Sequence, residues 1–277
     1  MRSERALRRV LLYFILTLGA ALCLVPIFWL VRSSLMTLVE IFKFPPLAWP
    51  AMMRWDNYAG AMTTFPFLLY FRNTLIVVVP TVLASLVTSS LSAYGLARFR
   101  FPLRGFWFSL VVGAIIVPPA VVLIPQFILW TRLRLVNTFF PLIVPSWFGG
   151  GAFNVFLLRQ FFMTVPRDFD EAARMDGATY FRIFRQILLP FIQPALIAVC
   201  LFQFFFQWND FFGPLIYLND PQTYTLAVGL THFIGTFATQ WNYLMAATVI
   251  IIVPPVIVFF VGQRYFVEGI TLTGIKM

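Results

Sequence analysis

Six long stretches without a single charged residue limit the fold of this chain more than any other feature. They cover residues 10–31, 73–97, 105–131, 135–158, 186–209 and 221–263. Each exceeds the roughly 20 apolar residues that an α-helix needs to cross a bilayer core of about 30 Å. The chain is only 11% charged and 61% hydrophobic, whereas about 25% of a soluble domain is charged. The sequence therefore predicts an all-α membrane protein and argues against a water-soluble fold.

We expect one transmembrane domain over residues 1–277, with six helices placed inside these stretches. The expected spans are residues 10–31, 73–97, 106–130, 138–158, 192–212 and 241–262. The connection 32–72 is rich in proline and tryptophan, which suits a loop at the membrane surface. The first half of 221–263 is rich in threonine, so an external loop is expected before the sixth span.

Prolines and glycines inside the expected spans indicate kinked and closely packed helices. Several expected spans contain proline, as the third does at Pro118 and Pro119, and Gly149–Gly151 lie in the middle of the fourth. In a membrane bundle, neighbouring helices can satisfy the carbonyls that proline leaves free. The kinks either serve packing alone or shape a central cavity or hinge. The three glycines are expected to allow close approach of another helix.

The distribution of basic residues predicts that both termini lie in the cytoplasm. With that orientation, 14 Arg and Lys residues fall in cytoplasmic segments and six in external ones, the bias typical of membrane proteins. The net charge of +10 then reflects topology and contact with anionic lipid, and nucleic acid is not an expected partner. A secretory signal is the alternative for the amino terminus, but a 22-residue apolar run exceeds a signal core of about 7–15. We expect an uncleaved anchor.

The segment 163–190, between the fourth and fifth spans, is where charges of both signs cluster. Pro166 can begin a helix. Three acidic residues would lie near the positive amino end of that helix: Asp168, Asp170 and Glu171. Gly177 can end it in the left-handed conformation, and Thr179 can cap a second helix that ends at Pro190. The sequence predicts a cytoplasmic helix-turn-helix suited to docking on a partner. The alternative is a solvated loop whose charges only fix topology.

The spacing inside this segment resembles the EAA signature of permease subunits in binding-protein-dependent ABC importers. Glu171-Ala172-Ala173 is followed after three residues by Gly177, and Ile187 and Leu189-Pro190 follow at the matching distances. Further stretches resemble the carbohydrate branch, specifically the maltose-transporter-type second permease. They are Arg159-Gln160-Phe161-Phe162, Asp176-Gly177-Ala178, Trp208-Asn209-Asp210-Phe211 and Ala93-Tyr94-Gly95-Leu96-Ala97-Arg98.

This resemblance implies a transporter subunit, not an enzyme, in a bacterial or archaeal inner membrane. Its partners would be a second, homologous permease in a heterodimer, two ABC ATPase subunits that bind ATP and Mg²⁺, and an extracytoplasmic solute-binding protein that delivers a sugar. A polyol or glycerol phosphate is the alternative substrate. This chain would hold no cofactor and no catalytic residue.

The resemblance also implies roles for residues of the EAA segment, which would seat coupling helices in the ATPase cleft. Glu171 would be a polar anchor, Ala172 and Ala173 the close-contact face, and Gly177 the turn. The remaining residues implied in coupling are Asp176, Ile187, Leu189 and Pro190. Closure of the ATPase pair would then swing the spans between inward-facing and outward-facing states.

Polar and aromatic residues within the spans form a second candidate set, for a translocation path. They are Gln126, Trp147, Asn154, Gln203, Gln207, Trp208 and Asn209. Binding sites for small molecules place a few polar groups among apolar and aromatic ones, as Gln203, Gln207 and Trp208 would on adjacent turns. The alternative is that these residues bond one helix to another or anchor it at the interface.

Two other classes of function fit less well. Ion-coupled carriers generally place ionisable residues near the bilayer midplane, and here the one candidate is Asp210, at the outer edge of the fifth span. An intramembrane enzyme or a metal site is not favoured, because the chain has only one histidine and two cysteines. Neither lysine, Lys43 or Lys276, follows a glycine-rich phosphate loop, so energy must come from a partner.

Overall fold

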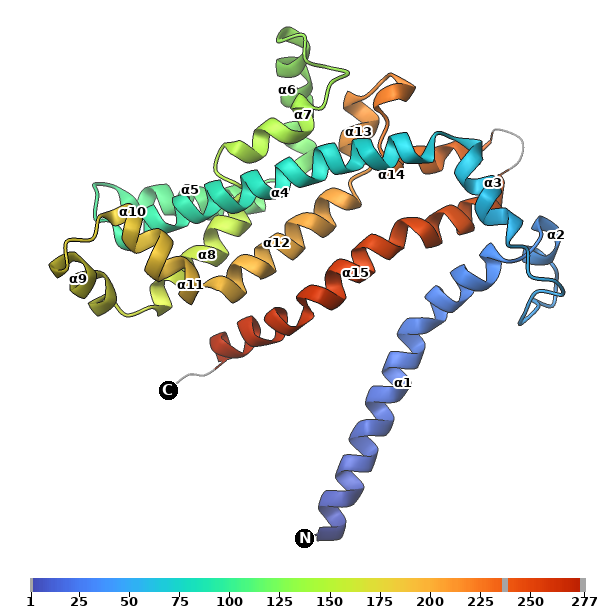
Figure 1. Cartoon of the computed structure of the whole chain (residues 1–277), viewed down its shortest axis with the longest axis horizontal. Helices are drawn as coiled ribbons and strands as arrows, with labels where there is room; N and C mark the ends of the chain where they lie inside the picture. Colours follow the sequence, from blue (N-terminus) through green and yellow to red (C-terminus); the bar gives the residue numbers. More distant parts are fainter. Residues whose placement is uncertain (1, 236–238, 275–277) are drawn as a thin grey trace. The chain divides into compact units, whose positions relative to one another are not determined.

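The computed structural model describes residues 2–235 and 239–274, and within these ranges the chain consists of helices joined by turns (Figure 1). Lys276 lies outside the described residues. The chain divides into two compact units. One comprises Met1–Leu68 with Gly229–Val253, and the other comprises Leu69–Val228 with Pro254–Met277.

Four helical segments are long and apolar enough to cross a membrane. They are Leu7–Ser34 in α1 (Arg2–Ser34), α4 (Phe67–Arg98), Phe140–Thr164, and Trp241–Gln263 in α15 (Trp241–Gly274). Two further helix pairs are long and apolar enough when each pair is counted as one segment, but each pair is sharply bent. They are α5 (Arg104–Ile116) with α6 (Pro119–Arg132), at 99°, and Tyr180–Phe191 with α12 (Gln193–Trp208), at 80°. The described residues thus provide four spans, or up to six if each bent pair counts as one.

The first unit is tied together by Asn57, which is buried in α3 (Asp56–Thr64). Its amide nitrogen donates to the carbonyl oxygens of Ser34 and Met36 at 2.9 Å each, and its amide oxygen accepts from Asn242 at 2.9 Å. The end of α1, the connection after it and the start of α15 therefore meet at one side chain. The expected surface loop also contains the short helix α2 (Leu38–Ile41).

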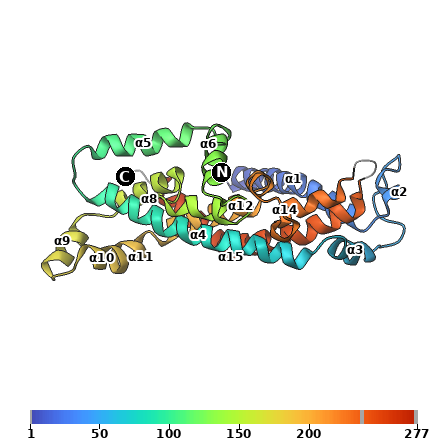
Figure 2. The ribbon, with the colours of Figure 1, turned by 90° about the horizontal axis from the view of Figure 1, so that it is seen from above.

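The second unit has its core where the carboxy-terminal half of α4 meets α8 (Ala152–Thr164) and the start of α12. Two short helices, α9 (Asp168–Met175) and α10 (Tyr180–Ile183), lie at the same end of this unit as the last turns of α4 (Figure 2). The remaining short elements are α7 (Phe140–Ile143), η1 (Val144–Trp147), α13 (Phe212–Tyr217), η3 (Pro221–Thr223), α14 (Leu226–Gly229) and η4 (Leu230–Phe233).

Proline and glycine break the third and fourth expected spans, although they do not break every span that holds them. The helix over 106–130 is interrupted at Pro118, whose backbone is extended (ψ 133°), because proline lacks an N–H and restricts the residue before it. Pro26 and Pro80 lie inside continuous helices. Gly149–Gly151 all have positive φ and separate η1 from α8.

Gly150 is the glycine that allows the expected close approach of a second helix. A Cβ atom at this position would lie 2.5 Å from the backbone oxygen of Ser85 and 2.6 Å from the backbone nitrogen of Ser89, both in α4. At Gly149, by contrast, a Cβ would meet no atom within 4 Å. Only glycine fits where the break before α8 rests on the backbone of α4.

Candidate functional site

The turn between α9 and α10 has the geometry that its sequence predicts. Gly177 has φ 80°, and its backbone N–H donates to the carbonyl of Arg174 at 3.0 Å. The N–H of Ala178 donates to the carbonyl of Ala173 at 2.9 Å. These two bonds form a Schellman motif, which satisfies the last carbonyls of a helix and requires a left-handed residue. A side chain at Gly177 would strain the backbone although the space around it is open.

The second helix of this segment begins at the expected cap but does not end at the expected proline. The hydroxyl of Thr179 accepts from the N–H of Arg182 at 3.3 Å. After α10 the chain makes a π-helical turn, η2 (Phe184–Leu188), and then α11 (Leu189–Phe191). Pro190 lies in the first turn of α11, where its missing N–H has no helical acceptor to lose. The break before α12 comes at Ile192 instead.

The residues of the EAA signature do not share one face of the molecule. Glu171, Ala172, Asp176 and Gly177 are exposed. Ala173 is only 9% exposed and packs in the core of the unit. Ile187 and Leu189 are half-buried against the same core. The surface that a partner can contact thus includes Ala172 but not Ala173, because Ala173 already packs α9 on its own chain.

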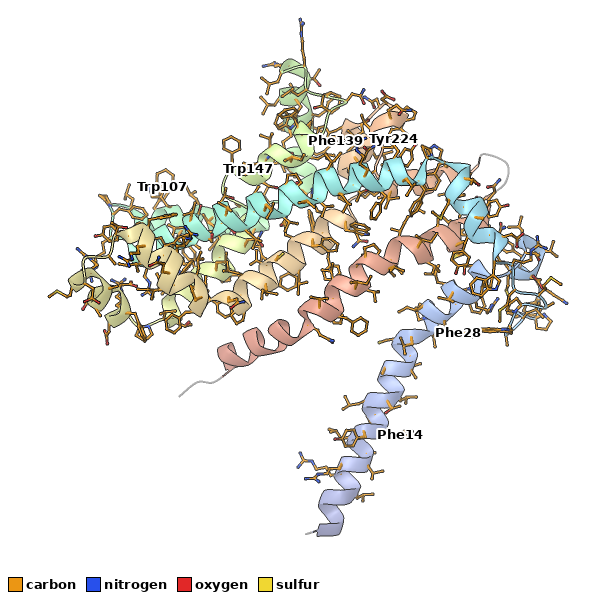
Figure 3. All side chains as sticks on the ribbon, in the orientation of Figure 1. Phe14, Phe28, Trp107, Phe139, Trp147 and Tyr224 are labelled. Atoms are coloured by element: carbon orange, nitrogen blue, oxygen red, sulfur yellow. The ribbon has the colours of Figure 1, made fainter. Side chains whose placement is uncertain are left out.

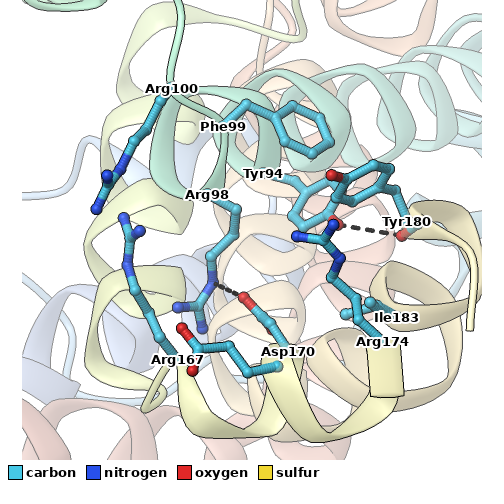
Figure 4. Close-up of a pocket in the computed structure, with 10 residues that line it drawn as sticks. Tyr94, Arg98, Phe99, Arg100, Arg167, Asp170, Arg174, Tyr180 and Ile183 are labelled. Carbon is cyan, nitrogen blue, oxygen red and sulfur yellow. Dashed lines mark hydrogen bonds and ion pairs between the residues drawn. The ribbon is translucent and has the colours of Figure 1, made fainter. Parts of the chain in front are cut away.

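An ion pair and a hydrogen bond connect α4 to both short helices. Arg98 Nε lies 3.3 Å from Asp170 Oδ2 in α9, and Arg98 Nη2 donates to the carbonyl of Val165 at 2.8 Å. The hydroxyl of Tyr94 donates to the carbonyl of Tyr180 in α10 at 3.1 Å (Figure 4). Burial raises the pKa of the Asp170 carboxyl, and this effect outweighs the lowering by nearby Arg98 and Arg167.

Sequence reasoning missed this connection. From the sequence, Arg98 and Tyr94 are notable only as parts of the stretch Ala93–Arg98 that resembles the family. The available signal was their four-residue spacing at the end of a span, which puts both side chains on one face of α4. Which segment that face contacts is decided by the tertiary structure.

A cavity of about 630 Å³ opens between the end of α4 and the short helices. It is lined by four arginines, two acidic residues, three aromatic residues and one isoleucine: Arg98, Arg100, Arg167, Arg174, Asp170, Glu171, Tyr94, Phe99, Tyr180 and Ile183. The side chains of Arg100 and Arg167 extend toward each other across it (Figure 4). The cavity therefore has a surplus of positive charge.

Helices α9 and α10 both expose large apolar side chains. Met175 is 88% exposed, and Phe169, Tyr180 and Phe181 are also exposed. Apolar residues that gather on a surface in this way mark a contact site for another protein or for lipid. The helix-turn-helix therefore carries these apolar side chains and part of the cavity lining, and the end of α4 supplies the rest of the lining.

The residues expected along a translocation path do not form one lining. Asn154 is buried, and its amide nitrogen donates to the carbonyl of Gly150 at 2.7 Å and to Gln203 Oε1 at 3.3 Å. These contacts join α8 to α12, as in the alternative of bonding between helices. Asn209 is exposed and donates to the carbonyl of Phe205 in its own helix at 2.8 Å.

The remaining path candidates are dispersed. Gln207 and Trp208 line a cavity of only about 10 Å³, which holds no more than one water. The ring of Trp208 contacts the rings of Phe71 and Phe204. Gln126 and Trp147 are exposed, on α6 and η1 respectively. In the part of the chain described, no three His, Cys, Asp or Glu side chains are placed to hold a metal ion.

The long apolar helices with their charged helix-turn-helix have the fold of an ABC transporter permease. Residues 85–272 match the family of binding-protein-dependent transport system inner membrane components, and the chain belongs to this family. It is therefore an ABC importer permease of the carbohydrate and polyol type, not an enzyme.

Three relatives illustrate the range of the family. The chain is 34% identical to the arabinooligosaccharides transport system permease of Bacillus subtilis, over 97% of this chain and 96% of the relative. It is 31% identical to the sn-glycerol-3-phosphate transport system permease of Rhizobium meliloti, over 99% of both. A crystal structure of a bacterial ABC transporter involved in import of the acidic polysaccharide alginate matches with a TM-score of 0.82 and 25% identity, over 96% of this chain and 98% of that one.

Proposed function

We propose that this chain is the permease subunit through which an ATP-driven importer translocates a sugar or an oligosaccharide. Relatives named for arabinooligosaccharides and a structural relative named for alginate support this substrate class. Relatives named for sn-glycerol-3-phosphate support the alternative of a phosphorylated polyol. The observation that carries the proposal is the EAA segment, with its Schellman turn at Gly177 and its attachment to α4.

The proposed assembly contains a second, homologous permease, two ATPase subunits that dock on the segment 163–190, and an extracytoplasmic solute-binding protein. ATP and Mg²⁺ bind to the ATPase subunits. The chain crosses a bacterial or archaeal inner membrane six times, with both termini in the cytoplasm. Family membership supports the location in the inner membrane and the partnership with a solute-binding protein. The excess of basic residues in the expected cytoplasmic segments supports the orientation.

Coupling in this proposal passes from α9 and α10 to α4. Glu171 and Ala172 are exposed and meet the ATPase, while Ala173 holds α9 on the core. Movement of the segment is transmitted by the Arg98–Asp170 ion pair and by the bond from Tyr94 to Tyr180. Packed helices of this kind move as rigid bodies between two arrangements.

The coupling role is tested with Glu171→Lys and Gly177→Val in the assembled transporter. Glu171→Lys reverses an exposed charge, and Gly177→Val puts a β-branched residue at φ 80°, so both should disturb the docking segment and spare the spans. We expect normal amounts of each variant in the membrane and loss of substrate-stimulated ATP hydrolysis. Gly113→Val, in α5 with no atom near the added Cβ, is the matched control. Full stimulation in both test variants would refute the assignment.

The substrate class is tested on the cognate binding protein. Purified binding protein is screened by thermal shift against mono- and oligosaccharides and against sn-glycerol-3-phosphate. Stabilisation by a saccharide supports the proposed class. Stabilisation by sn-glycerol-3-phosphate alone would replace it with the alternative.

A further inference from the structure

A second basic cavity shares Arg98 and Arg167 with the first and lies where the end of α4, the start of α5 and the end of α8 converge. Its volume is about 220 Å³. Four arginines line it: Arg98, Arg104, Arg159 and Arg167. The other lining residues are Ala97, Met163, Thr164, Val165 and Pro166, so no acidic side chain contributes.

Protein groups leave most of the donors of these arginines available. Arg104 donates one bond to the carbonyl of Phe99 at 3.1 Å. Arg159 donates to the carbonyl of Leu96 at 3.4 Å, and its guanidinium lies 3.8 Å from the centre of the Phe108 ring. Arg98 pairs with Asp170 at 3.3 Å, and the same carboxylate attracts Arg167, whereas Arg104 and Arg159 have no acidic partner among the described residues. Each guanidinium has five N–H donors, so several remain for a ligand.

Holding these positive charges together costs free energy unless an anion offsets it. The four arginines come from α4, α5, α8 and the connection after α8, so the cluster is built by the fold and not by one exposed loop. Arginine is the residue best suited to bidentate contact with phosphate oxygens. Basic pockets between membrane helices on the cytoplasmic side are typical sites for anionic lipid headgroups.

An exposed apolar surface begins beside this cavity. Helix α5 starts at Arg104, and its first two turns expose Phe106, Trp107 and Leu110. The indole of Trp107 is 52% exposed and projects from the helix (Figure 3). Tryptophan is enriched where a helix meets the lipid headgroups. A ligand with a charged head and apolar tails can therefore contact the arginines and α5 at once.

We propose that Arg104, Arg159 and Arg167 bind the phosphate of an anionic phospholipid from the cytoplasmic leaflet, with its acyl chains along α5. The cavity exceeds the ~30 Å³ share of one water several-fold. The inference rests on the orientation proposed above and not on the proposed substrate. An acidic segment of the ATPase fits less well, because the exposed apolar side chains beside the cavity belong to a membrane helix.

The test measures lipid retention and needs neither transport nor ATP hydrolysis. The assembled transporter is placed in mixed micelles with phosphatidylglycerol and phosphatidylcholine of identical acyl chains, and retained lipid is counted by native mass spectrometry. The variants are Arg104→Gln/Arg159→Gln, the charge-preserving Arg104→Lys/Arg159→Lys, and the control Arg132→Gln/Arg134→Gln at the far end of α6. Each arginine near an anionic surface contributes about fivefold. We expect the phosphatidylglycerol preference to fall roughly 30-fold in the Gln pair and to persist in the Lys pair and the control.

Three results would overturn the proposal. The first is equal retention of the two lipids by the wild-type complex. The second is an unchanged preference in the Gln pair when the Gln pair assembles normally. The third is a result that assigns the cavity to soluble anions. Inorganic phosphate, added without anionic lipid, would bind to the wild-type complex in equilibrium dialysis, and the Gln pair would no longer bind it. The wild-type complex would also show no preference between the two lipids. Loss of substrate transport with retained lipid preference would instead count against the proposed function alone.

Discussion

The EAA segment and the buried contact at Asn154 place polar residues in different environments. In the segment, Glu171 and Asp176 remain exposed, and Asp170 pairs with Arg98 in α4. In the path set, Asn154 is buried and bonded to Gly150 and Gln203, whereas Asn209 is exposed and its side chain is bonded to Phe205 in its own helix. A buried polar residue such as Asn154 joins two helices, whereas an exposed one such as Glu171 is available to a partner.

The two environments follow from the solvent around each region. In the bilayer core, an unbonded polar group is costly, so polar side chains find partners on neighbouring helices. Glu171 is exposed, so water can satisfy it, and in the proposed assembly the ATPase would replace that water. Variants that remove a contact in one region and leave the other region intact test this difference.

The largest effect is expected at Gly150, where a helix break rests on the backbone of α4. Gly150→Ala puts a methyl group 2.5 Å from the Ser85 oxygen at a left-handed φ of 68°. Overpacking and backbone strain together should lower the free energy of unfolding by about 3 kcal/mol. Gly149→Ala has the strain without the clash and isolates the strain contribution. Thermal unfolding of the purified complex measures both, and equal losses would show that close approach is unimportant.

A smaller effect is expected from breaking the ion pair between α4 and α9. The Arg98 and Asp170 side chains are 5% and 19% exposed, so Arg98→Gln leaves a largely buried carboxylate without its partner. Unfolding free energy should fall by about 2 kcal/mol, and Arg98→Gln/Asp170→Asn should recover part of it. The exposed pair Arg54–Asp56 is the control, because such pairs contribute well under ~1 kcal/mol. An equal loss of stability at both pairs would show that the Arg98–Asp170 ion pair does not hold α9 to α4.

The same variant makes a prediction about pH. Because burial raises the pKa of the Asp170 carboxyl above its ordinary 3.8, the folded protein holds this proton more tightly than the unfolded chain does. The contribution of Asp170 to stability therefore falls as pH rises from the unfolded pKa to the folded one. A protonated Asp170 needs no counter-charge, so the penalty of Arg98→Gln should shrink as the pH falls and Asp170 takes up its proton. Unfolding curves of the variant and wild type at neutral and acidic pH test this, and a penalty that grows on acidification would contradict it.

The smallest effect is expected at the Asn154–Gln203 contact, which decides between a packing role and a path role. If the pair only joins helices, Asn154→Ala should cost about 1–2 kcal/mol of stability through lost hydrogen bonds and leave the transport KM unchanged. Asn209→Ala, which removes an exposed bond within one helix, should change neither. A shift in transport KM for Gln203→Ala without loss of stability would show instead that Gln203 lines the translocation path.

The features that could be predicted from the sequence are local ones. Gly177 ends α9 and Thr179 caps α10, because caps depend on residues three or four positions apart in the chain. Helix α15 begins at Trp241, where the last expected span was placed, because the apolar run starts there. The burial of Ala173 next to the exposed Ala172 could not be predicted, because both are small and apolar and the side that packs depends on α4.

By itself, the sequence determined that this chain is helical, apolar and equipped with one charged helix-turn-helix. Hydropathy and capping act over short distances, so they can be read in order along the chain. Only the tertiary structure decided that Arg98 pairs with Asp170, that Gly150 rests on α4, and that four arginines share one cavity. These features depend on contacts between residues tens of positions apart, and such contacts form when helices pack and not before.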